Sequence, residues 1–377
     1  MNKKKIVFVT GTRADFGKLK PLMEKVEKSK KIKSFIFVTG MHLLKKYGST
    51  FNEVEKSGFK NIHKFSNQKS QTDSDIILGN TIKGLNEFCK KIKPDMIIVH
   101  GDRVETLAGA IVGSFNNILV SHVEGGEISG TIDELIRHAV TKLSHIHFVS
   151  NKEAKKRLIQ LGENKNSIFI IGSPDIEIML SKDLPSLNET KKRYQIDFKK
   201  YNVFIFHPIT TEIKSLKNQI VEVTKALKKS NQNYVVIYPN NDLGSEIILN
   251  ELNKLEKNHC FKIFPSIRFV YFLTLLKNAE FVIGNSSAIV RESEVYGIPA
   301  ISIGTRQLKR SPNKDIINVQ PEKNEILKAI DKALNLKIKS RSYFGGSIKS
   351  SNEFIKTLDN EKIWKTPLQK QFIDLKN

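Results

Sequence analysis

Cysteine is scarce in this sequence, and its scarcity excludes several classes of protein. Only two of the 377 residues are cysteine, Cys89 and Cys260, and they lie far apart without C-x-x-C spacing. This usage excludes a disulfide framework and a cysteine zinc site. It is typical of a reducing compartment, so we expect a cytoplasmic protein.

Long apolar runs are also missing. No stretch reaches the roughly 18 consecutive apolar residues that suggest a membrane-spanning helix, so we expect no membrane partner. Met1 to Lys5 is basic, but the apolar run Ile6 to Val9 that follows is too short for a signal-peptide core and lacks a cleavage site. We predict that this run forms a first buried strand.

Acidic residues are few beside the basic ones. The chain has 62 Lys and Arg against 39 Asp and Glu, a net charge of +23, and its lysines are spread through segments such as 25–33 and 152–156. One interpretation is a composition bias on solvated faces, and another is attraction of a polyanionic ligand such as a phosphate. Nucleic acid is the weaker interpretation, because zinc-finger spacing, a ribonucleoprotein motif and aromatics interleaved with basic residues are all missing.

Short apolar runs alternate with helical patterns along nearly the whole chain, which is longer than one core usually organises. This rhythm predicts an α/β fold of two Rossmann-like, doubly wound domains. Ser181 to Lys200 is polar and interrupts the rhythm, so we expect domains at 1–180 and 181–377, the second ending in a tail that is helical from Asn352. Ligands of such sheets bind beyond the carboxyl ends of the strands, which favours a site in the cleft between the domains.

The predicted elements are short and regularly spaced. In the first half we expect strands at 5–10, 34–39, 96–100, 118–123, 146–150 and 168–172, with helices at 17–28 and 104–114. In the second half we expect strands at 202–206, 234–238, 261–264, 281–284 and 300–303, with helices at 213–229, 245–257, 268–278 and 287–296.

Polar clusters follow three predicted strands of the first half. The turn Thr10 to Lys18 contains Arg13 and suits either an anion or an ordinary strand-to-helix connection; it is not a Walker A loop, because Leu19 replaces the Ser or Thr. His100-Gly101-Asp102-Arg103 and His122-Val123-Glu124-Gly125-Gly126-Glu127 follow the next two. Their acids could cap helices, but carboxylates beside glycine at two adjacent strand ends favour function.

The segment Thr131 to His138 allows two interpretations. Asp133 and Arg137 are four apart, so they could form a surface ion pair on one helix face or belong to the site. The histidines that follow, His138, His145 and His147, lack the spacing of metal ligands, and a core or hydrogen-bonded role is expected for the last two.

The second half carries a matching set of polar strand ends. These are His207-Pro208, Tyr238-Pro239-Asn240-Asn241-Asp242, Gly284-Asn285-Ser286-Ser287 and Gly304-Thr305-Arg306-Gln307. The two serines would begin a helix that places Glu292 two turns in, where it could accept hydrogen bonds from ribose hydroxyls. Capping by the serines is compatible with phosphate binding at the same end.

At these residues the chain resembles the hydrolysing UDP-N-acetylglucosamine 2-epimerases of sialic-acid biosynthesis. The resemblance is carried by GTRAD, IVHGDR, HVEGGEISGTIDELIRH, HPITTEI, YPNND, GNSSAIVRE and GTRQ, in the expected order from residue 10 to about 310. Non-hydrolysing relatives typically have proline and glutamate where Ala14-Asp15 stand here. Two departures are Glu134, where many members have aspartate, and Gly17, where some have serine.

The resemblance implies a GT-B type fold, UDP held mainly by the second domain, catalytic carboxylates mainly from the first, and a homodimer. It implies no cofactor and no metal, and it implies conversion of UDP-N-acetylglucosamine to UDP and N-acetylmannosamine through a glycal. The implied catalytic residues are Asp102, Glu124, Asp133 and His207. The implied UDP and substrate contacts are Arg13, Lys18, Arg103, His207, Asn240, Ser286, Ser287, Glu292 and Arg306.

Three alternative functions remain open. One is the same reaction on a modified substrate, such as a diacetamido-trideoxy sugar nucleotide of a legionaminic-acid pathway. Another is a GT-B glycosyltransferase, although a transferase has no need of three first-domain carboxylates around carbon 2. The third is a basic nucleic-acid binder, supported by net charge alone. Sequence reasoning does not assign which carboxylate is the base.

Overall fold

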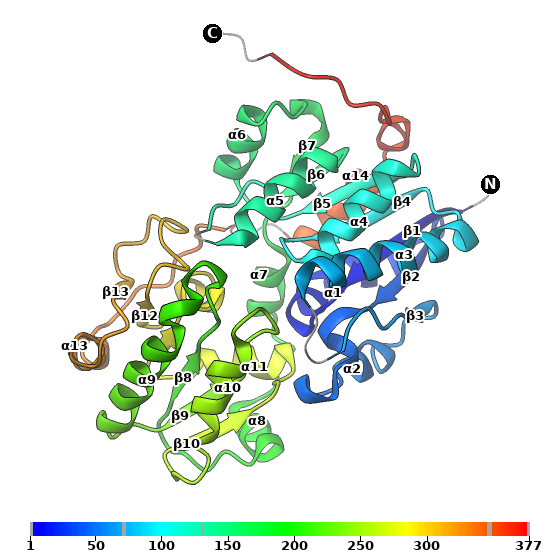
Figure 1. Cartoon of the computed structure of the whole chain (residues 1–377). Helices are drawn as coiled ribbons and strands as arrows, with labels where there is room; N and C mark the ends of the chain where they lie inside the picture. Colours follow the sequence, from blue (N-terminus) through cyan, green and yellow to red (C-terminus); the bar gives the residue numbers. More distant parts are fainter. Residues whose placement is uncertain (1–2, 70–72, 130, 345–348, 375–377) are drawn as a thin grey trace. The chain divides into compact units, whose positions relative to one another are not determined.

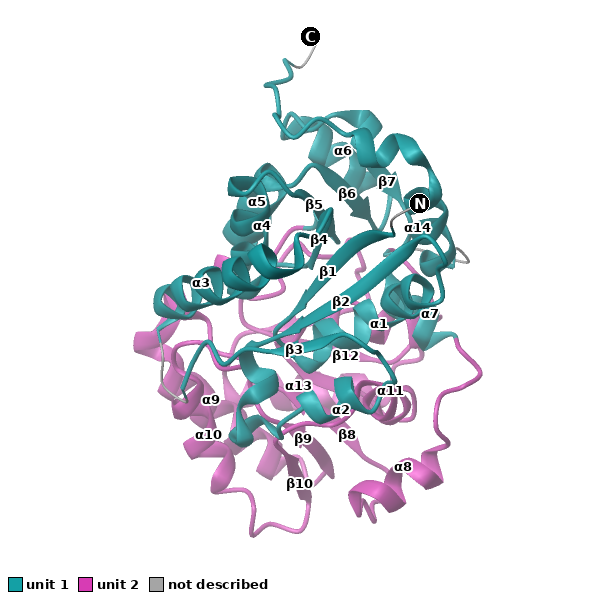
Figure 2. Cartoon of the chain, turned by 90° about the vertical axis from the view of Figure 1, so that its right-hand side faces the viewer, with its two compact units in different colours: residues 1–127, 133–180, 344–377 teal, residues 128–132, 181–343 magenta. Residues whose placement is uncertain are grey.

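The computed structural model describes residues 3–69, 73–129, 131–344 and 349–374 (Figure 1). The chain divides into unit 1, residues 1–127, 133–180 and 344–377, and unit 2, residues 128–132 and 181–343 (Figure 2). Each unit contains one sheet in which every described pair of strands is parallel. The predicted pair of Rossmann-like α/β domains is therefore confirmed.

The sheet of unit 1 has the strand order β3-β2-β1-β4-β5-β6-β7. Its strands are β1 (Lys4–Thr10), β2 (Ile32–Val38), β3 (Ile62–Lys64), β4 (Met96–His100), β5 (Leu119–Val123), β6 (Ile146–Val149) and β7 (Ile168–Ile170). Its helices are α1 (Arg13–Glu27), α2 (Phe51–Glu55), α3 (Ser74–Ile92), α4 (Val104–Phe115), α5 (Ile132–Leu143), α6 (Lys152–Gln160), α7 (Pro174–Met179) and α14 (Ser350–Asp359).

Both faces of this sheet are covered, and β1 shows how. Ile6 and Phe8 pack with residues of α1 and α14 on one face, whereas Val7 and Val9 pack with residues of α3, α4 and α5 on the other. A strand buried on both faces is apolar at successive positions, as parallel sheets require. The carboxyl ends of β1, β4 and β5 are thereby fixed at one edge of the sheet.

The sheet of unit 2 has the strand order β10-β9-β8-β11-β12-β13. Its strands are β8 (Asn202–Ile205), β9 (Tyr234–Ile237), β10 (Phe261–Phe264), β11 (Val282–Gly284), β12 (Ala300–Ile303) and β13 (Ile317–Val319). Its helices are α8 (Leu187–Tyr194), α9 (Ile213–Lys229), α10 (Ser245–Asn253), α11 (Phe269–Lys277), α12 (Glu292–Tyr296) and α13 (Lys323–Leu334). Apolar residues of α9, α10 and α13 pack on one face of this sheet.

The C-terminal tail differs from its predicted place. We expected it in the second domain, but residues 344–377 belong to unit 1. The reason is apolar: Phe354 of α14 is fully buried, with its ring 6.5 Å from that of Phe8 and 4.8 Å from that of Phe148. Residues 345–348, at the start of the predicted tail, lie outside the described part of the chain.

The helix predicted at 287–296 is also wrong as a single element. The chain forms a 3₁₀ turn, η5 (Ser287–Ile289), and then a separate helix α12 that begins at Glu292. Glu292 is thus the first residue of a short helix, not a residue two turns inside a long one. No glycine or proline marks the break, so the apolar periodicity of the sequence predicted one continuous helix.

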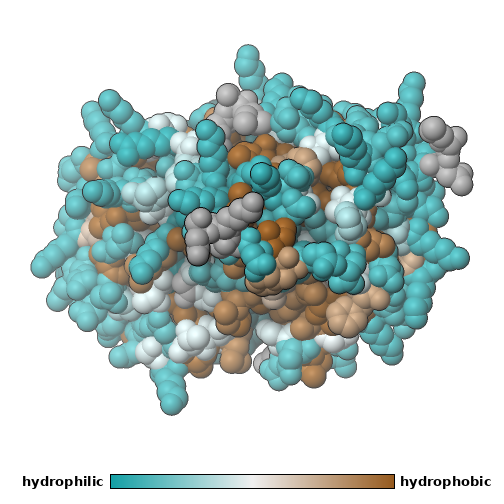
Figure 3. All heavy atoms as spheres, turned by 90° about the horizontal axis from the view of Figure 1, so that it is seen from above, coloured by the Kyte–Doolittle hydropathy of each residue, from teal (hydrophilic) through white to brown (hydrophobic). Residues whose placement is uncertain are grey.

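Two short strands, β3 and β13, were not predicted. Each has three residues, none of them buried, and each lies at an edge of its sheet. In the described part of the chain, no helix is long and apolar enough to cross a membrane. Figure 3 shows hydrophilic side chains over most of the face it presents, with apolar groups scattered among them.

Candidate active site

The turn after β1 is organised by Asp15. Its carboxylate accepts hydrogen bonds from Gly11 N at 3.0 Å, Thr12 N at 3.1 Å and Thr10 Oγ1 at 2.5 Å. Asp15 N donates to the Thr12 hydroxyl in return, which completes a capping box and starts α1 at Arg13, before the predicted position 17. Asp15 is therefore a scaffold of the turn, and Arg13 and Lys18 are its cations.

Glu105 packs directly against the glycine of this turn. A Cβ atom on Gly11 would lie 2.8 Å from Glu105 Cδ. Glu105 is 2% exposed, and burial raises the pKa of its carboxyl, although the charge of Arg103 opposes the shift. Arg103, a predicted phosphate contact, is the N-cap residue of α4, with its Nε 3.6 Å from Glu105 Oε2. The turn after β1 and the first turn of α4 thus form one packed corner.

Lys18 was predicted as a phosphate contact, but its described partners are carboxylates. Its Nζ lies 3.0 Å from Asp175 Oδ2 and 3.8 Å from Glu124 Oε2. Asp175 is 1% exposed and stands in the first turn of α7. Sequence reasoning missed Asp175, although the predicted strand 168–172 ends three residues before it, because the segment after that strand was not singled out.

Glu124 occupies a strained and buried position at the end of β5. Its φ of +64° lies in the left-handed region, which is costly for a residue with a side chain and often marks a functional site. Its side chain contacts His100 Nε2 at 3.0 Å and accepts a hydrogen bond from Ser173 Oγ. His100 stood in a motif that we singled out but not among the predicted site residues, and Ser173, which directly follows the predicted strand 168–172, was not selected.

Asp102 is bound by a buried arginine. Arg137 of α5 is 1% exposed and donates from Nη2 to Asp102 and from Nη1 to Glu127 O at 3.0 Å. Burial by itself would lower the pKa of Arg137, but the charges of Asp102, Glu127 and Asp133 raise it, so the guanidinium stays protonated. The surface ion pair considered for Asp133 and Arg137 is therefore wrong, because Arg137 is buried.

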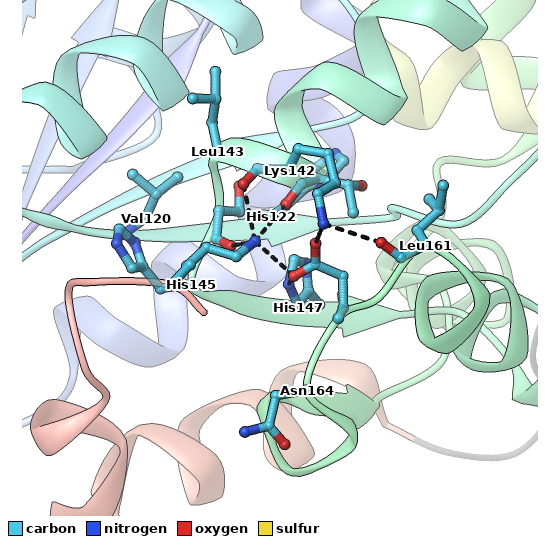
Figure 4. Close-up of polar contacts among 12 residues, drawn as sticks. Val120, His122, Lys142, Leu143, His145, His147, Leu161 and Asn164 are labelled. Carbon is cyan, nitrogen blue, oxygen red and sulfur yellow. Dashed lines mark hydrogen bonds and ion pairs between the residues drawn. The ribbon is translucent and has the colours of Figure 1, made fainter. Parts of the chain in front are cut away.

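The buried histidines of β5 and of the start of β6 are neutral groups held by hydrogen bonds. His122 contacts Gly101 O at 2.8 Å and Thr141 Oγ1 at 3.2 Å, and burial lowers its pKa to about 3. His145 and His147 have the hydrogen-bonded role that we expected, with Val120 N and Glu163 among their partners (Figure 4). Among the described residues, no group of three or more His, Cys, Asp or Glu is placed to hold a metal ion.

In unit 2, His207 and Asn240 are joined directly. Asn240 N donates to His207 Nδ1 at 3.0 Å, so a neutral His207 ring carries its proton on Nε2. Asn285 Oδ1 accepts from His207 N at 2.6 Å, and Asn285 Nδ2 donates to His207 O at 2.8 Å. Asn285, which sequence reasoning did not select as a site residue, thus fixes the histidine backbone.

The backbone carbonyl of Asn285 also binds two side chains that follow β12. It accepts from Arg306 Nη1 at 3.3 Å and from Gln307 Nε2 at 2.9 Å. Ser286 caps η5 by accepting from Ala288 N, and Ser287 is the first residue of that turn. His207, Asn240, Ser286, Ser287 and Arg306 are therefore near one edge of the sheet, at the ends of β8, β9, β11 and β12.

Comparison with known proteins gives consistent matches. A family model described as UDP-N-acetylglucosamine 2-epimerase matches residues 24–363. The chain is 47% identical over 99% of both chains to the UDP-N-acetylglucosamine 2-epimerase of Neisseria meningitidis serogroup B. It is 34% identical to the UDP-N,N'-diacetylbacillosamine 2-epimerase (hydrolyzing) of Legionella pneumophila, over 91% of this chain and 92% of that one.

A solved structure shares the fold. It is the UDP-GlcNAc 2-epimerase of Methanocaldococcus jannaschii in complex with UDP-GlcNAc and UDP, with a TM-score of 0.81 and 24% identity. The match covers 94% of this chain and 99% of that one. The likeness confirms the expected GT-B type fold.

Proposed function

We propose that this chain, which belongs to the UDP-N-acetylglucosamine 2-epimerase family, is a hydrolysing member that converts UDP-N-acetylglucosamine and water to N-acetylmannosamine and UDP. One observation carries the proposal. Asp102 and Glu124 follow the adjacent parallel strands β4 and β5, and each carboxylate is bound by its own set of side chains. Two differently held carboxylates are what an elimination followed by a hydration needs.

The chemistry explains the residue types. Carbon 2 of the sugar carries no acidic proton while carbon 1 is an acetal. As the C1–O bond breaks, UDP takes its electron pair, and positive charge at carbon 1 acidifies the neighbouring proton. A base removes that proton, and the electrons of the C2–H bond form the double bond of a glycal. The oxygen of water then adds to carbon 1, an acid protonates carbon 2 on the other face, and the second proton of water goes to a base.

We assign the base role to Asp102 and the acid role to Glu124. The guanidinium of Arg137 stabilises the ionised form of Asp102, which is the form that can accept a proton. Glu124 is 4% exposed, and burial favours the protonated form that can donate, against the opposing charge of Lys18 at 3.8 Å. His100, in contact with Glu124 at 3.0 Å, can return a proton to it after each turnover. Asp133, whose charge acts on Arg137, belongs to the same proposal as a third carboxylate.

Unit 2 is proposed to hold the nucleotide. His207, Asn240, Ser286, Ser287 and Arg306 offer imidazole, amide, hydroxyl and guanidinium groups, which suit a diphosphate and its sugar. Glu292, buried at the start of α12, is proposed for the ribose. Arg13 and Arg103 of unit 1 are proposed to stabilise the charge that grows on the departing UDP. For Lys18, the contacts with Asp175 and Glu124 favour a role beside the carboxylates over a phosphate contact.

Product analysis with UDP-N-acetylglucosamine and no acceptor tests the proposal. Nuclear magnetic resonance should show free UDP and N-acetylmannosamine. UDP-N-acetylmannosamine as the stable product would mean a non-hydrolysing epimerase, and turnover only with an added acceptor would mean a transferase. Wild-type turnover in D₂O should place one deuterium at carbon 2.

A modified substrate is the second candidate, and the name of the Legionella relative favours it. The same incubation with UDP-N,N'-diacetylbacillosamine separates the two. Faster turnover of that substrate would change the proposed sugar of the substrate but not the proposed type of reaction. The role in sialic-acid biosynthesis is supported by the block HVEGGEISGTIDELIRH, which resembles enzymes of that pathway.

A further inference from the structure

The C-terminal segment, residues 366–374, has neither helix nor strand, yet one of its side chains is held at four points. Lys370 Nζ lies 2.7 Å from Ser144 O, 2.9 Å from Lys142 O, 3.3 Å from Thr141 O and 2.6 Å from Glu163 Oε2. Three of these acceptors are carbonyls at the C-terminal end of α5. The dashed lines of Figure 4 show this cluster.

These contacts complete the end of α5. The last four carbonyls of a helix, here those of residues 140–143, have no partner inside it. The hydroxyls of Ser144 and Ser114 each donate to one of them. Lys370 donates to the other two, of which Thr141 O also accepts from Ser144 N at 3.1 Å, and it places a positive charge at the negative end of the helix dipole. The tail therefore supplies part of the cap of α5 from 226 or more residues away in sequence.

The positive charge of Lys370 is paired with the carboxylate of Glu163. This carboxylate is 3% exposed and contacts His147 Nε2 at 2.9 Å. Burial alone would raise the pKa of Glu163, but the hydrogen bond with His147 and the bond and charge of Lys370 lower it to about 2, so it is ionised at neutral pH. His145 fixes the tail a second time, since its Nδ1 accepts from Val120 N and its Nε2 is 3.0 Å from Leu368 O.

The helix fixed in this way carries two links to the proposed base. Arg137, about one turn before the capped end, donates to Asp102. Thr141 Oγ1 is 3.2 Å from His122, whose other ring nitrogen is 2.8 Å from Gly101 O, next to Asp102. A shift of α5 would therefore move both supports of Asp102.

We infer that Lys370 is a positioning residue, which fixes the C-terminal end of α5 and thereby keeps Arg137 in place on Asp102. The inference rests on the proposed function, in which Asp102 is the base. Lys370 touches no reacting atom in this account and acts through the helix alone.

Three variants test the inference. Lys370→Met should lower kcat by roughly 10- to 100-fold, the effect of a small misplacement at a reacting centre, with KM and UDP affinity unchanged. Lys370→Arg, which keeps the charge, should recover most of the loss. Lys142→Met is the matched control, because Lys142 contacts the same Glu163 at 2.9 Å but lies 49% exposed, and its other acceptor is Leu161 O at the end of α6 rather than a carbonyl of α5. It should stay within about twofold of wild type, because Lys370 and His147 still contact Glu163 and Lys370 still donates to the carbonyls of α5.

The double variant Lys370→Met with Asp102→Asn separates positioning from general destabilisation. If Lys370 acts through Asp102, the double variant should be no slower than Asp102→Asn alone. Rates that multiply, or a Lys370→Met enzyme with wild-type kcat, would overturn the inference.

Hydrogen exchange supplies a readout that needs no substrate. Lys370→Met should speed exchange of the amides at the C-terminal end of α5, and Lys142→Met should not. If wild-type protein releases no UDP, the proposed function fails, while exchange still decides whether Lys370 holds the helix. Unchanged α5 exchange in Lys370→Met would refute the structural half of the inference.

Discussion

Asparagine in place of Asp102 removes one negative charge and keeps nearly the same shape. The side chain of Asp102 is 22% exposed and is bound by Arg137 Nη2. The amide oxygen of asparagine can still accept that hydrogen bond, and Arg137 Nη1 keeps its bond to Glu127 O at 3.0 Å. We therefore expect Asp102→Asn to fold and to bind UDP.

The magnitudes separate stability from catalysis. Removing one partner of a fully buried ion pair costs about 3–5 kcal/mol. Because Asp102 is partly exposed and the amide keeps a hydrogen bond, a loss of about 1–2 kcal/mol is expected here. The loss in rate should be larger, about 10²- to 10⁴-fold for a positioned base, which corresponds to about 3–5 kcal/mol of activation free energy.

The assay is UDP release from UDP-N-acetylglucosamine, followed by nuclear magnetic resonance of the sugar. A variant without its base should leave the substrate intact and form no glycal. The matched control is Asp95→Asn, at the opposite end of β4, where Asp95 pairs with Lys4 at 2.7 Å. That variant should keep its activity within about twofold, because an exposed pair contributes little.

Two results would refute the reasoning about Asp102. Near-normal turnover by Asp102→Asn would make the carboxylate a structural partner of Arg137 and nothing more. Glycal accumulating in this variant would show that elimination proceeds without Asp102, and the base and acid roles would have to be exchanged.

Three further outcomes are expected. Glu124→Gln should accumulate the glycal, because the hydration step lacks its acid. The control is Glu177→Gln: Glu177 lies on α7, as Asp175 does, but accepts hydrogen bonds from Ser351 of α14, so this variant should turn over normally. Arg306→Ala should raise KM and weaken UDP binding by calorimetry with little change in kcat; unchanged affinity would remove it from the nucleotide site. Burial lowers the pKa of His42 from 6.5 to about 4 and that of His122 to about 3. The unfolded chain therefore binds more protons than the folded one below pH 6.5, and thermal melts should show stability falling as the pH falls through that value. A stability that does not change with pH there would contradict the burial of these two histidines in their neutral form.

The order of strands was predictable because burial on both faces leaves an apolar signal. The runs at 5–10, 96–100 and 118–123 are β1, β4 and β5 within a residue, and helix 213–229 is α9. The start of α1 was missed because Thr10 to Lys18 was interpreted as a turn, either for an anion or as an ordinary connection, although the spacing of Thr12 and Asp15 also forms a capping box. Local sequence supports both interpretations, and only the hydrogen bonds distinguish them.

The partners of the carboxylates were harder to predict, for a physical reason. Asp102 and Arg137 are separated by 35 positions, and Glu124 and Ser173 by 49. Such pairs form because β4, β5 and the connection after β7 end at one edge of the sheet, and no local pattern encodes that meeting. The tail shows the extreme case, since Lys370 reaches Ser144 across 226 positions.

The same contacts explain why two neighbouring carboxylates can have opposite roles. Asp102 and Glu124 follow strands that are paired in register, with His100 beside Val123, so the fold alone would treat them alike. Their partners differ: a buried guanidinium that cannot release its proton binds Asp102, whereas a histidine and a serine hydroxyl contact Glu124 more closely than the ammonium of Lys18, which is 3.8 Å away. A fixed cation favours a permanent carboxylate, and exchangeable partners favour a group that gains and loses a proton in each cycle. The division between base and acid would therefore depend on the partners of the two carboxylates, namely Arg137 on α5 and His100 at the end of β4.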